Sequence, residues 1–283
     1  MRLACDISNL CNRFGDKKVF EMLKEAGFDG VDYSFYEIKP LSGLVDDDYL
    51  EKAKKIRLWL DEAGLICNQT HAPFEFSYGD EMDCSGMNYR NIVRCMEISA
   101  IMGAKCIVIH AITPPDGVDI FEYNTRFYRS FIPYCEKFGI EIAVENIARG
   151  HSVGKQVGVF ETAKQLCDFV YNLGSPWFCV CVDLGHAAIM NESPEKFISE
   201  MKPELLKVLH VHDTDYYHDC HTLPYLQKQN WDATIEALKT VKYKGDFSLE
   251  VLAYTASFPD ELVEPALSFV AEVGKYLVKK FNN

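Results

Sequence analysis

The fold is decided by four short stretches: KCIVIHA at 105–111, IEIAVENI at 140–147, FCVCVDL at 178–184 and LKVLHVHD at 206–213. Each stretch is apolar along most of its length and rich in Val, Ile or Leu. Strands of a parallel sheet have this composition, because helices cover both faces of the sheet and leave neither face to water. Further stretches of the same kind lie outward along the chain, at 3–8, 30–35, 65–71 and 246–252. The sequence therefore predicts eight strands.

Amphipathic patterns between these strands predict helices, most clearly at 19–27, 47–64, 88–103, 162–174 and 231–243. Several of the helices end in a glycine that can close a tight turn into the next strand: Gly27, Gly64, Gly103, Gly139 and Gly174. Eight such units predict an α/β fold, a (β/α)8 TIM barrel formed as a single domain by residues 1–283. The structural alternative is a doubly wound sheet, but CDISNLCNRFG after the first strand lacks the G-x-G-x-x-G phosphate loop.

Composition narrows the class of protein. The chain has 283 residues, of which 48% are apolar, and 29 Lys and Arg against 42 Asp and Glu give a net charge of −13. These values exclude a disordered chain and disfavour nucleic acid as a partner, because phosphate backbones are held by Lys and Arg. The start MRLACDISNL lacks the apolar run of a signal peptide or a membrane span. Eleven cysteines without a C-x-x-C motif predict reduced thiols and a cytoplasmic location.

Polar residues stand at the ends of six successive strands. They are His71, His110, Glu145, Asp183 with the nearby His186, His210 with His212, and Glu250; Asp219 and His221 occupy the loop after the seventh strand. The carboxyl ends of barrel strands meet at one end of the barrel, where TIM-barrel active sites lie. Carboxylates that converge there would repel one another unless a cation lay between them. Imidazole and carboxylate are common ligands of divalent metals, so the pattern predicts a metal site.

The same residues resemble the xylose isomerase-like barrels, which include sugar-phosphate isomerases and epimerases and, as a hydrolytic relative, endonuclease IV. The resemblance extends over the whole chain. It is carried by HAPF at 71–74, VIHA at 108–111, VEN at 144–146, DLGHA at 183–187, HVHD at 210–213, D-x-H at 219–221 and the glutamate at 250.

The resemblance implies that Glu145, Asp183, His210 and Glu250 bind one divalent metal. His210 is preferred to His212 because the family ligand stands three residues before an acidic residue, here Asp213, although an error of two positions is allowed by strand alternation. His186 matches a position that contacts substrate or binds a second metal. The remaining matches to the three-zinc cluster of the endonuclease are His71, His110, Asp219 and His221.

The chemistry implied is a metal-dependent isomerisation or epimerisation of a sugar or sugar phosphate. A divalent ion (Zn, Mn, Mg or Co) would hold the carbonyl and hydroxyl oxygens and stabilise an enediolate. Glu145 and Glu250 would be the acid–base pair that removes and returns the proton next to the carbonyl. Asp32 is expected either to reach a sugar hydroxyl or to cap the following turn.

Three alternatives remain open at this point. The first is an endonuclease IV-like zinc phosphodiester hydrolase, which the ligand types permit and the negative charge opposes. The second is a metal-dependent dehydratase of the inositol or shikimate type, and the third is a metal-bound barrel without activity. Tyr216 stands where ketose 3-epimerases carry an arginine, which argues against a strict 3-epimerase. Related barrels often pair, so a homo-oligomer is allowed; a membrane partner is not expected.

Overall fold

Eight parallel strands form the inner wall of a barrel in the computed structural model, which describes residues 1–35, 47–73, 87–148, 159–190 and 192–283. The strands are β1 (Leu3–Asp6), β2 (Gly30–Ser34), β3 (Ile66–His71), β4 (Cys106–Ile109), β5 (Glu141–Glu145), β6 (Phe178–Asp183), β7 (Leu206–His210) and β8 (Phe247–Leu249). They pair in the order β7-β6-β5-β4-β3-β2-β1-β8. Each strand therefore lies beside its neighbour in sequence, and β8 lies beside β1.

Backbone hydrogen bonds just past the end of β7 close the barrel. The amide of Val211 donates to the carbonyl of Ser248 at 2.9 Å, and the amide of Glu250 donates to the carbonyl of Val211 at 2.9 Å. The predicted (β/α)8 barrel is confirmed. The predicted strands are each found within a few residues, but β8 ends at Leu249, so Glu250 lies just beyond its strand.

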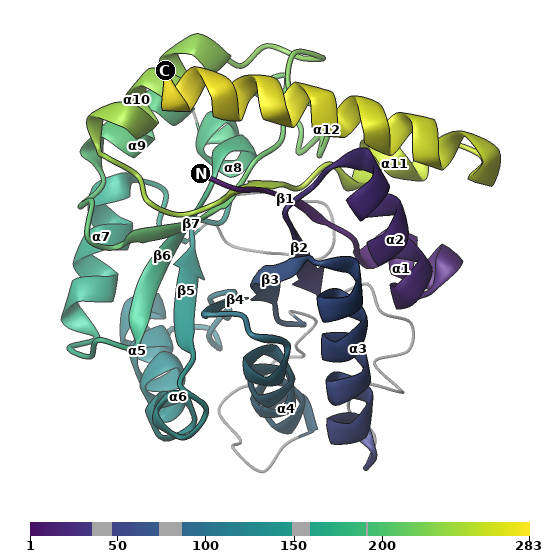
Figure 1. The fold of residues 1–283 in the computed structure, drawn as a ribbon. Helices are drawn as coiled ribbons and strands as arrows, with labels where there is room; N and C mark the ends of the chain where they lie inside the picture. The colour runs from purple at the N-terminus through teal and green to yellow at the C-terminus, as the bar shows by residue number, and fades with distance from the viewer. Residues whose placement is uncertain (36–46, 74–86, 149–158, 191) are drawn as a thin grey trace.

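Helices surround the strands on the outside (Figure 1). They are α1 (Ser8–Phe14), α2 (Asp16–Ala26), α3 (Tyr49–Ala63), α4 (Met87–Met102), α5 (Ile120–Ser130), α6 (Ile132–Phe138), α7 (Ala163–Asn172), α8 (Leu184–Ile189), α9 (Pro194–Glu200), α10 (Trp231–Thr240), α11 (Leu252–Ala256) and α12 (Asp260–Asn282). Gly27, Gly64 and Gly139 adopt φ of 90°, 67° and 68° after α2, α3 and α6, as predicted for helix-ending glycines.

The last helix, α12, packs against β1 and β8, the first and last strands of the barrel. A Cβ atom on Gly274 of α12 would lie 2.5 Å from a methyl group of Leu3 in β1 and 3.1 Å from one of Leu249 in β8, so a larger residue would have to push these side chains aside. Across the described residues, no helix combines the length and the apolar character needed to cross a bilayer.

Candidate metal centre

The ten residues predicted for the site come together at the carboxyl ends of the strands, where their side chains form one continuous network of contacts. They are His71, His110, Glu145, Asp183, His186, His210, His212, Asp219, His221 and Glu250. Most of them are less than 10% exposed. Six of the eight histidines of the chain belong to this network.

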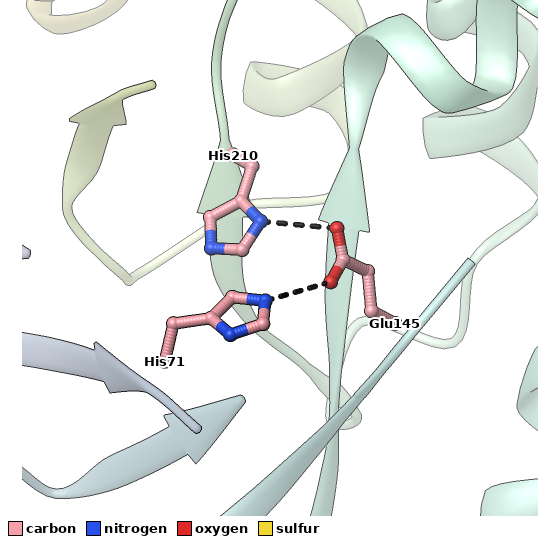
Figure 2. A group of neighbouring side chains, drawn as sticks. All are labelled: His71, Glu145 and His210. Carbon is pink, nitrogen blue, oxygen red and sulfur yellow. Dashed lines mark hydrogen bonds and ion pairs between the residues drawn. The ribbon is translucent and has the colours of Figure 1, made fainter. Parts of the chain in front are cut away.

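Glu145, the last residue of β5, is the centre of the first half of the network. Its Oε1 lies 3.0 Å from Nδ1 of His210, and its Oε2 lies 2.8 Å from Nε2 of His110 and 3.5 Å from Nε2 of His71. Figure 2 shows the Glu145 carboxylate facing the rings of His71 and His210, which come from β3 and β7, each two strands away from β5. Every ion-pair contact of Glu145 with a described residue is with a histidine.

His210, the last residue of β7, joins three of the predicted ligands through one nitrogen. Its Nδ1 lies 3.0 Å from Glu145 Oε1, 3.5 Å from Glu250 Oε2 and 4.0 Å from Asp183 Oδ2. Ligands bound to one ion at about 2.0–2.2 Å lie about 3–4 Å from one another. Each of the three carboxylates thus lies from His210 Nδ1 at the distance of two ligands that share an ion, and Asp183, His210 and Glu250 form one group with ligand spacing.

The other nitrogen of His210 points into the barrel. Its Nε2 lies 3.7 Å from Oδ2 of Asp32, a buried residue of β2. The same Asp32 oxygen accepts hydrogen bonds from Gln69 Nε2 at 2.5 Å and from Ser248 Oγ at 3.0 Å. Asp32 is thus held behind His210 by two barrel residues, while the turn after β2 that it was expected to cap continues into residues 36–46, outside the described residues.

Asp183 has two structural roles at the junction of β6 and α8. Its Oδ1 accepts the amide of His186 at 2.6 Å and so caps the N-terminus of α8. Its two carboxylate oxygens lie 3.1 and 3.2 Å from Nε2 of His212. The glycine of the DLGH motif makes this contact possible, because a Cβ on Gly185 would lie 2.0 Å from Cε1 of His212.

The second half of the network surrounds Asp219 and His221 in the loop between β7 and α10. Asp219 Oδ2 lies 2.7 Å from His221 Nε2 and 3.7 Å from His186 Nε2, and its Oδ1 lies 3.5 Å from His212 Nε2. The rings of His212 and His221 stack with their centroids 4.2 Å apart. His221 Nδ1 lies 3.7 Å from Glu250 Oε2, which connects this half to the first.

Two residues that the sequence motifs contain without an assigned role hold the site in place. Asn146 of VEN accepts the amide of Asp183 at 2.8 Å and donates to its carbonyl at 2.9 Å, which locks β6 to the end of β5. The carboxylate of Asp213 accepts the Trp231 Nε1–H and the amides of Thr214, Gln227 and Gln229 at 2.8–3.1 Å. Asp213 therefore organises the loop that carries Asp219 and His221.

Burial and histidine neighbours move the pKa values of the carboxylates in different directions. Burial alone would raise the pKa of Glu145, but His210 and His110 outweigh it and hold that pKa well below its usual range. Burial raises the pKa of Glu250, and His210 and His221 only partly offset it. Burial also raises the pKa of Asp32, to about 7. The two glutamates next to His210 are thus chemically inequivalent.

The histidines carry the positive charge that balances these carboxylates. Burial disfavours the charged form of His221, but Glu250 and Asp219 outweigh it and raise its pKa to about 10. Both of its nitrogens face acceptors, namely Asp219 Oδ2 and the carbonyl of Glu250. His210 likewise has a pKa well above its usual value despite burial.

The donor set fits a divalent cation. Every ion-pair contact of Asp183 with a described residue is with a histidine, as it is for Glu145, so in this part of the chain the only counter-charges in contact with these two carboxylates are imidazole protons. A divalent ion that displaces these protons satisfies the same carboxylates and leaves neutral imidazole as a ligand. The residues also form overlapping groups of three with the spacing of metal ligands, such as Asp183 with His210 and Glu250, and His212 with His221 and Glu250.

Comparison with known proteins agrees with this architecture. An uncharacterized protein of Sinorhizobium fredii, y4fM, is 23% identical over 269 residues, which cover 83% of this chain and 81% of that protein. A D-tagatose 3-epimerase-like protein superposes with a TM-score of 0.77 at 18% identity, covering 100% of this chain and 98% of the other. The IOLI protein, solved with a bound zinc atom, superposes with a TM-score of 0.75 at 16% identity and the same coverage.

The model of the family described as xylose isomerase-like TIM barrel matches residues 20–273. This match covers every strand except β1 and includes all ten residues of the network. The chain belongs to the xylose isomerase-like TIM barrel family.

Proposed function

We propose that this protein is a divalent-metal-dependent isomerase or epimerase of a sugar or sugar phosphate. The observation that carries the proposal is the position of His210 Nδ1, 3.0–4.0 Å from oxygens of Glu145, Glu250 and Asp183. Three carboxylates grouped around one imidazole nitrogen form a ligand set that suits a hard or borderline cation. The similarity to a D-tagatose 3-epimerase-like protein supports a sugar as the substrate, and the zinc of IOLI supports the metal.

In this proposal Glu145, Asp183, His210 and Glu250 hold the ion. When bound, a divalent cation supplies Lewis-acid polarisation and a fixed point for the carbonyl and hydroxyl oxygens of the substrate. The remaining chemistry belongs to the side chains. Glu145 and Glu250 approach His210 from β5 and from the end of β8, so they lie on two sides of the same point.

Proton transfer at the carbon next to the carbonyl is assigned to these two glutamates. One carboxylate takes the proton from carbon, and the other carboxylic acid returns a proton to the neighbouring or the opposite position. His186 Nδ1 lies 2.8 Å from the Asn146 carbonyl, and its Nε2 lies 3.7 Å from Asp219 Oδ2, so we assign this ring, together with Asp219, to contact with a substrate oxygen or a second ion.

A specific observation also favours phosphodiester hydrolysis as a second candidate. His212, Asp219 and His221 form a second group of ligand atoms beside Glu250, and His71 and His110 form a third beside Glu145. Sites of this kind suit reactions in which several ions clamp the attacking and the leaving oxygens. Against this candidate stands the net charge of −13.

Solvent deuterium exchange tests the first candidate. The protein is loaded with zinc or manganese and incubated in D₂O with a panel of ketoses, aldoses and their phosphates, and carbon-bound deuterium is measured by mass spectrometry. We expect incorporation with at least one sugar and its loss in Glu250→Gln. A protein that binds three ions per chain, cleaves a phosphodiester and exchanges no proton would refute the isomerase in favour of the hydrolase.

We also propose the cytoplasm as the compartment of this protein, since the ten described cysteines carry free thiols.

A further inference from the structure

The outer face of α12 carries three large apolar side chains at intervals of seven residues. Leu262, Phe269 and Tyr276 are 49%, 53% and 51% exposed. Seven residues are nearly two helical turns, so these side chains form one line along the helix, which we call the α12 stripe. The core-facing side of α12 is separate, because Val263, Leu267 and Val270 are fully buried.

The apolar surface continues from the α12 stripe onto the loop before α10. Tyr225 and Leu226 are 49% and 50% exposed, and the ring centroids of Tyr225 and Tyr276 lie 6.1 Å apart. Single exposed apolar residues are common on protein surfaces, but a contiguous group of them marks an interaction site. Figure 1 shows α12 on the outside of the molecule over its full length.

The charges along α12 change sign from one end to the other. Its first turns carry Asp260, Glu261 and Glu264, and its last turns carry Lys275, Lys279 and Lys280. Glu261 and Lys279 are exposed and form no ion pair with another described residue. A parallel copy of this helix would place acid against acid, whereas an antiparallel copy places the acidic end against the basic end.

We propose that the α12 stripe is a dimer interface, in which it packs against the same stripe of a second copy of this chain. Such an interface is isologous and has a two-fold axis. With the axis at Phe269, that residue meets its own equivalent, and Leu262 lies opposite Tyr276 of the partner subunit because both are seven residues from the axis. Glu261 then lies within one helical turn of Lys279 of the partner subunit.

Cysteine cross-linking tests the register. Phe269→Cys should form a disulfide-linked dimer under mild oxidation, because the two-fold axis brings the residue to itself. Leu262→Cys alone and Tyr276→Cys alone should stay monomeric on a denaturing gel, while an equimolar mixture of the two should cross-link. Cross-linking of Leu262→Cys with itself but not of Phe269→Cys would overturn the antiparallel register.

Sedimentation of the full chain tests the interface itself. We expect a wild-type dimer, and a dimer dissociation constant at least about tenfold weaker for Phe269→Glu, since aromatic residues at the centre of an interface contribute most. Tyr171→Glu is the matched control, because Tyr171 is 70% exposed on α7, away from the stripe. Circular dichroism of each variant checks the fold.

A charge exchange separates a second copy from any other partner. Glu261→Lys and Lys279→Glu should each weaken the dimer, and the double variant should recover it, because the exchanged charges face each other again. A wild-type protein that stays monomeric at about 100 µM, or a Phe269→Glu variant that dimerises like wild type, would refute the proposal. So would a double variant weaker than both singles. None of these residues belongs to the metal centre, so the outcome is independent of the proposed function.

Discussion

Strands β4 to β7 carry different chemistry at their two ends. At the amino ends stand Cys106, Glu141, Cys179 and Lys207, and at the carboxyl ends stand His110, Glu145, Asp183 and His210. Glu141 has its own cation, because Lys207 Nζ lies 2.5 Å from its Oε2 at the barrel surface. Glu145, four residues further along the same strand, has only imidazoles for partners among the described residues.

The difference is the reason that the proposed ion is placed at the carboxyl end of the barrel. At the amino end, Lys207 is the counter-charge of the Glu141 carboxylate, and the Cys106 and Cys179 thiols contact each other at 3.8 Å. The carboxyl end places Glu145, Asp183 and Glu250 around one imidazole nitrogen, and among the described residues Glu145 and Asp183 form ion pairs with histidines alone. Single substitutions and metal removal can either abolish this difference between the two ends of the strands or measure it.

The largest effect is expected from comparing the two glutamates of β5. Glu145→Gln should lower proton exchange by at least about 10²-fold, because it removes both an ion ligand and a general base. Glu141→Gln is the matched control on the same strand, and its rate should stay near wild type. The measurement is deuterium incorporation into the best substrate of the panel. Equal losses in both variants would show that the carboxyl end has no special role.

Removal of metal should affect stability strongly. Ligands that bind only the folded state stabilise it by about 2.7 kcal/mol at a concentration of 100 times Kd. Chelation should therefore lower the melting temperature of wild type by several degrees, and added zinc or manganese should restore it. Lys207→Met at the opposite end should respond to chelation like wild type. An unchanged melting temperature, with no metal found by elemental analysis, would argue against the centre.

Gly185→Ala should disturb the carboxyl end without changing any ligand. The added methyl would lie 2.0 Å from the His212 ring, so this ring must move away from Asp183. Overpacking of this kind costs about 1–3 kcal/mol of unfolding free energy. The double variant Gly185→Ala with His212→Ala should recover part of that stability in thermal unfolding. Additive losses in the double-mutant cycle would contradict the contact.

The smallest effect is expected from replacing Asp32, and the direction of the resulting change in stability depends on whether metal is bound. In the metal-free protein its pKa is raised to about 7 by burial, whereas the unfolded chain releases this proton near pH 4. Between these values the folded state binds more protons, so the contribution of Asp32 to stability falls as pH rises towards 7. Asp32→Asn should therefore stabilise the metal-free protein above pH 7.

The same variant should weaken metal binding. Asp32 lies behind His210, and loss of a carboxylate behind a histidine ligand typically lowers metal affinity about 10–100-fold. Thermal unfolding at pH 5 and pH 8, together with calorimetric titration of zinc, measures both effects. Weaker metal-free stability at pH 8 and unchanged zinc affinity would show that Asp32 serves only to fill the barrel.

The barrel could be predicted from the sequence because its signals are local. Apolar strands such as CIVI, amphipathic helices and glycines at helix ends each report on neighbours within a few residues. The strand-end residues of the centre were predictable for the same reason, since the fold places all carboxyl ends at one side. Glu250 was found although β8 ends at Leu249, three residues earlier than predicted.

Only the tertiary structure decided how these side chains face one another. His210 and His212 are equivalent in the alternation of a strand, yet Nδ1 of His210 meets three carboxylates, while Nε2 of His212 meets Asp183 and Asp219. The roles of Asn146, Asp213 and Asp32 also depend on contacts with segments far away in sequence. Sequence periodicity places a residue on a face of its element, but the partner of a buried polar atom is set by how separate elements pack.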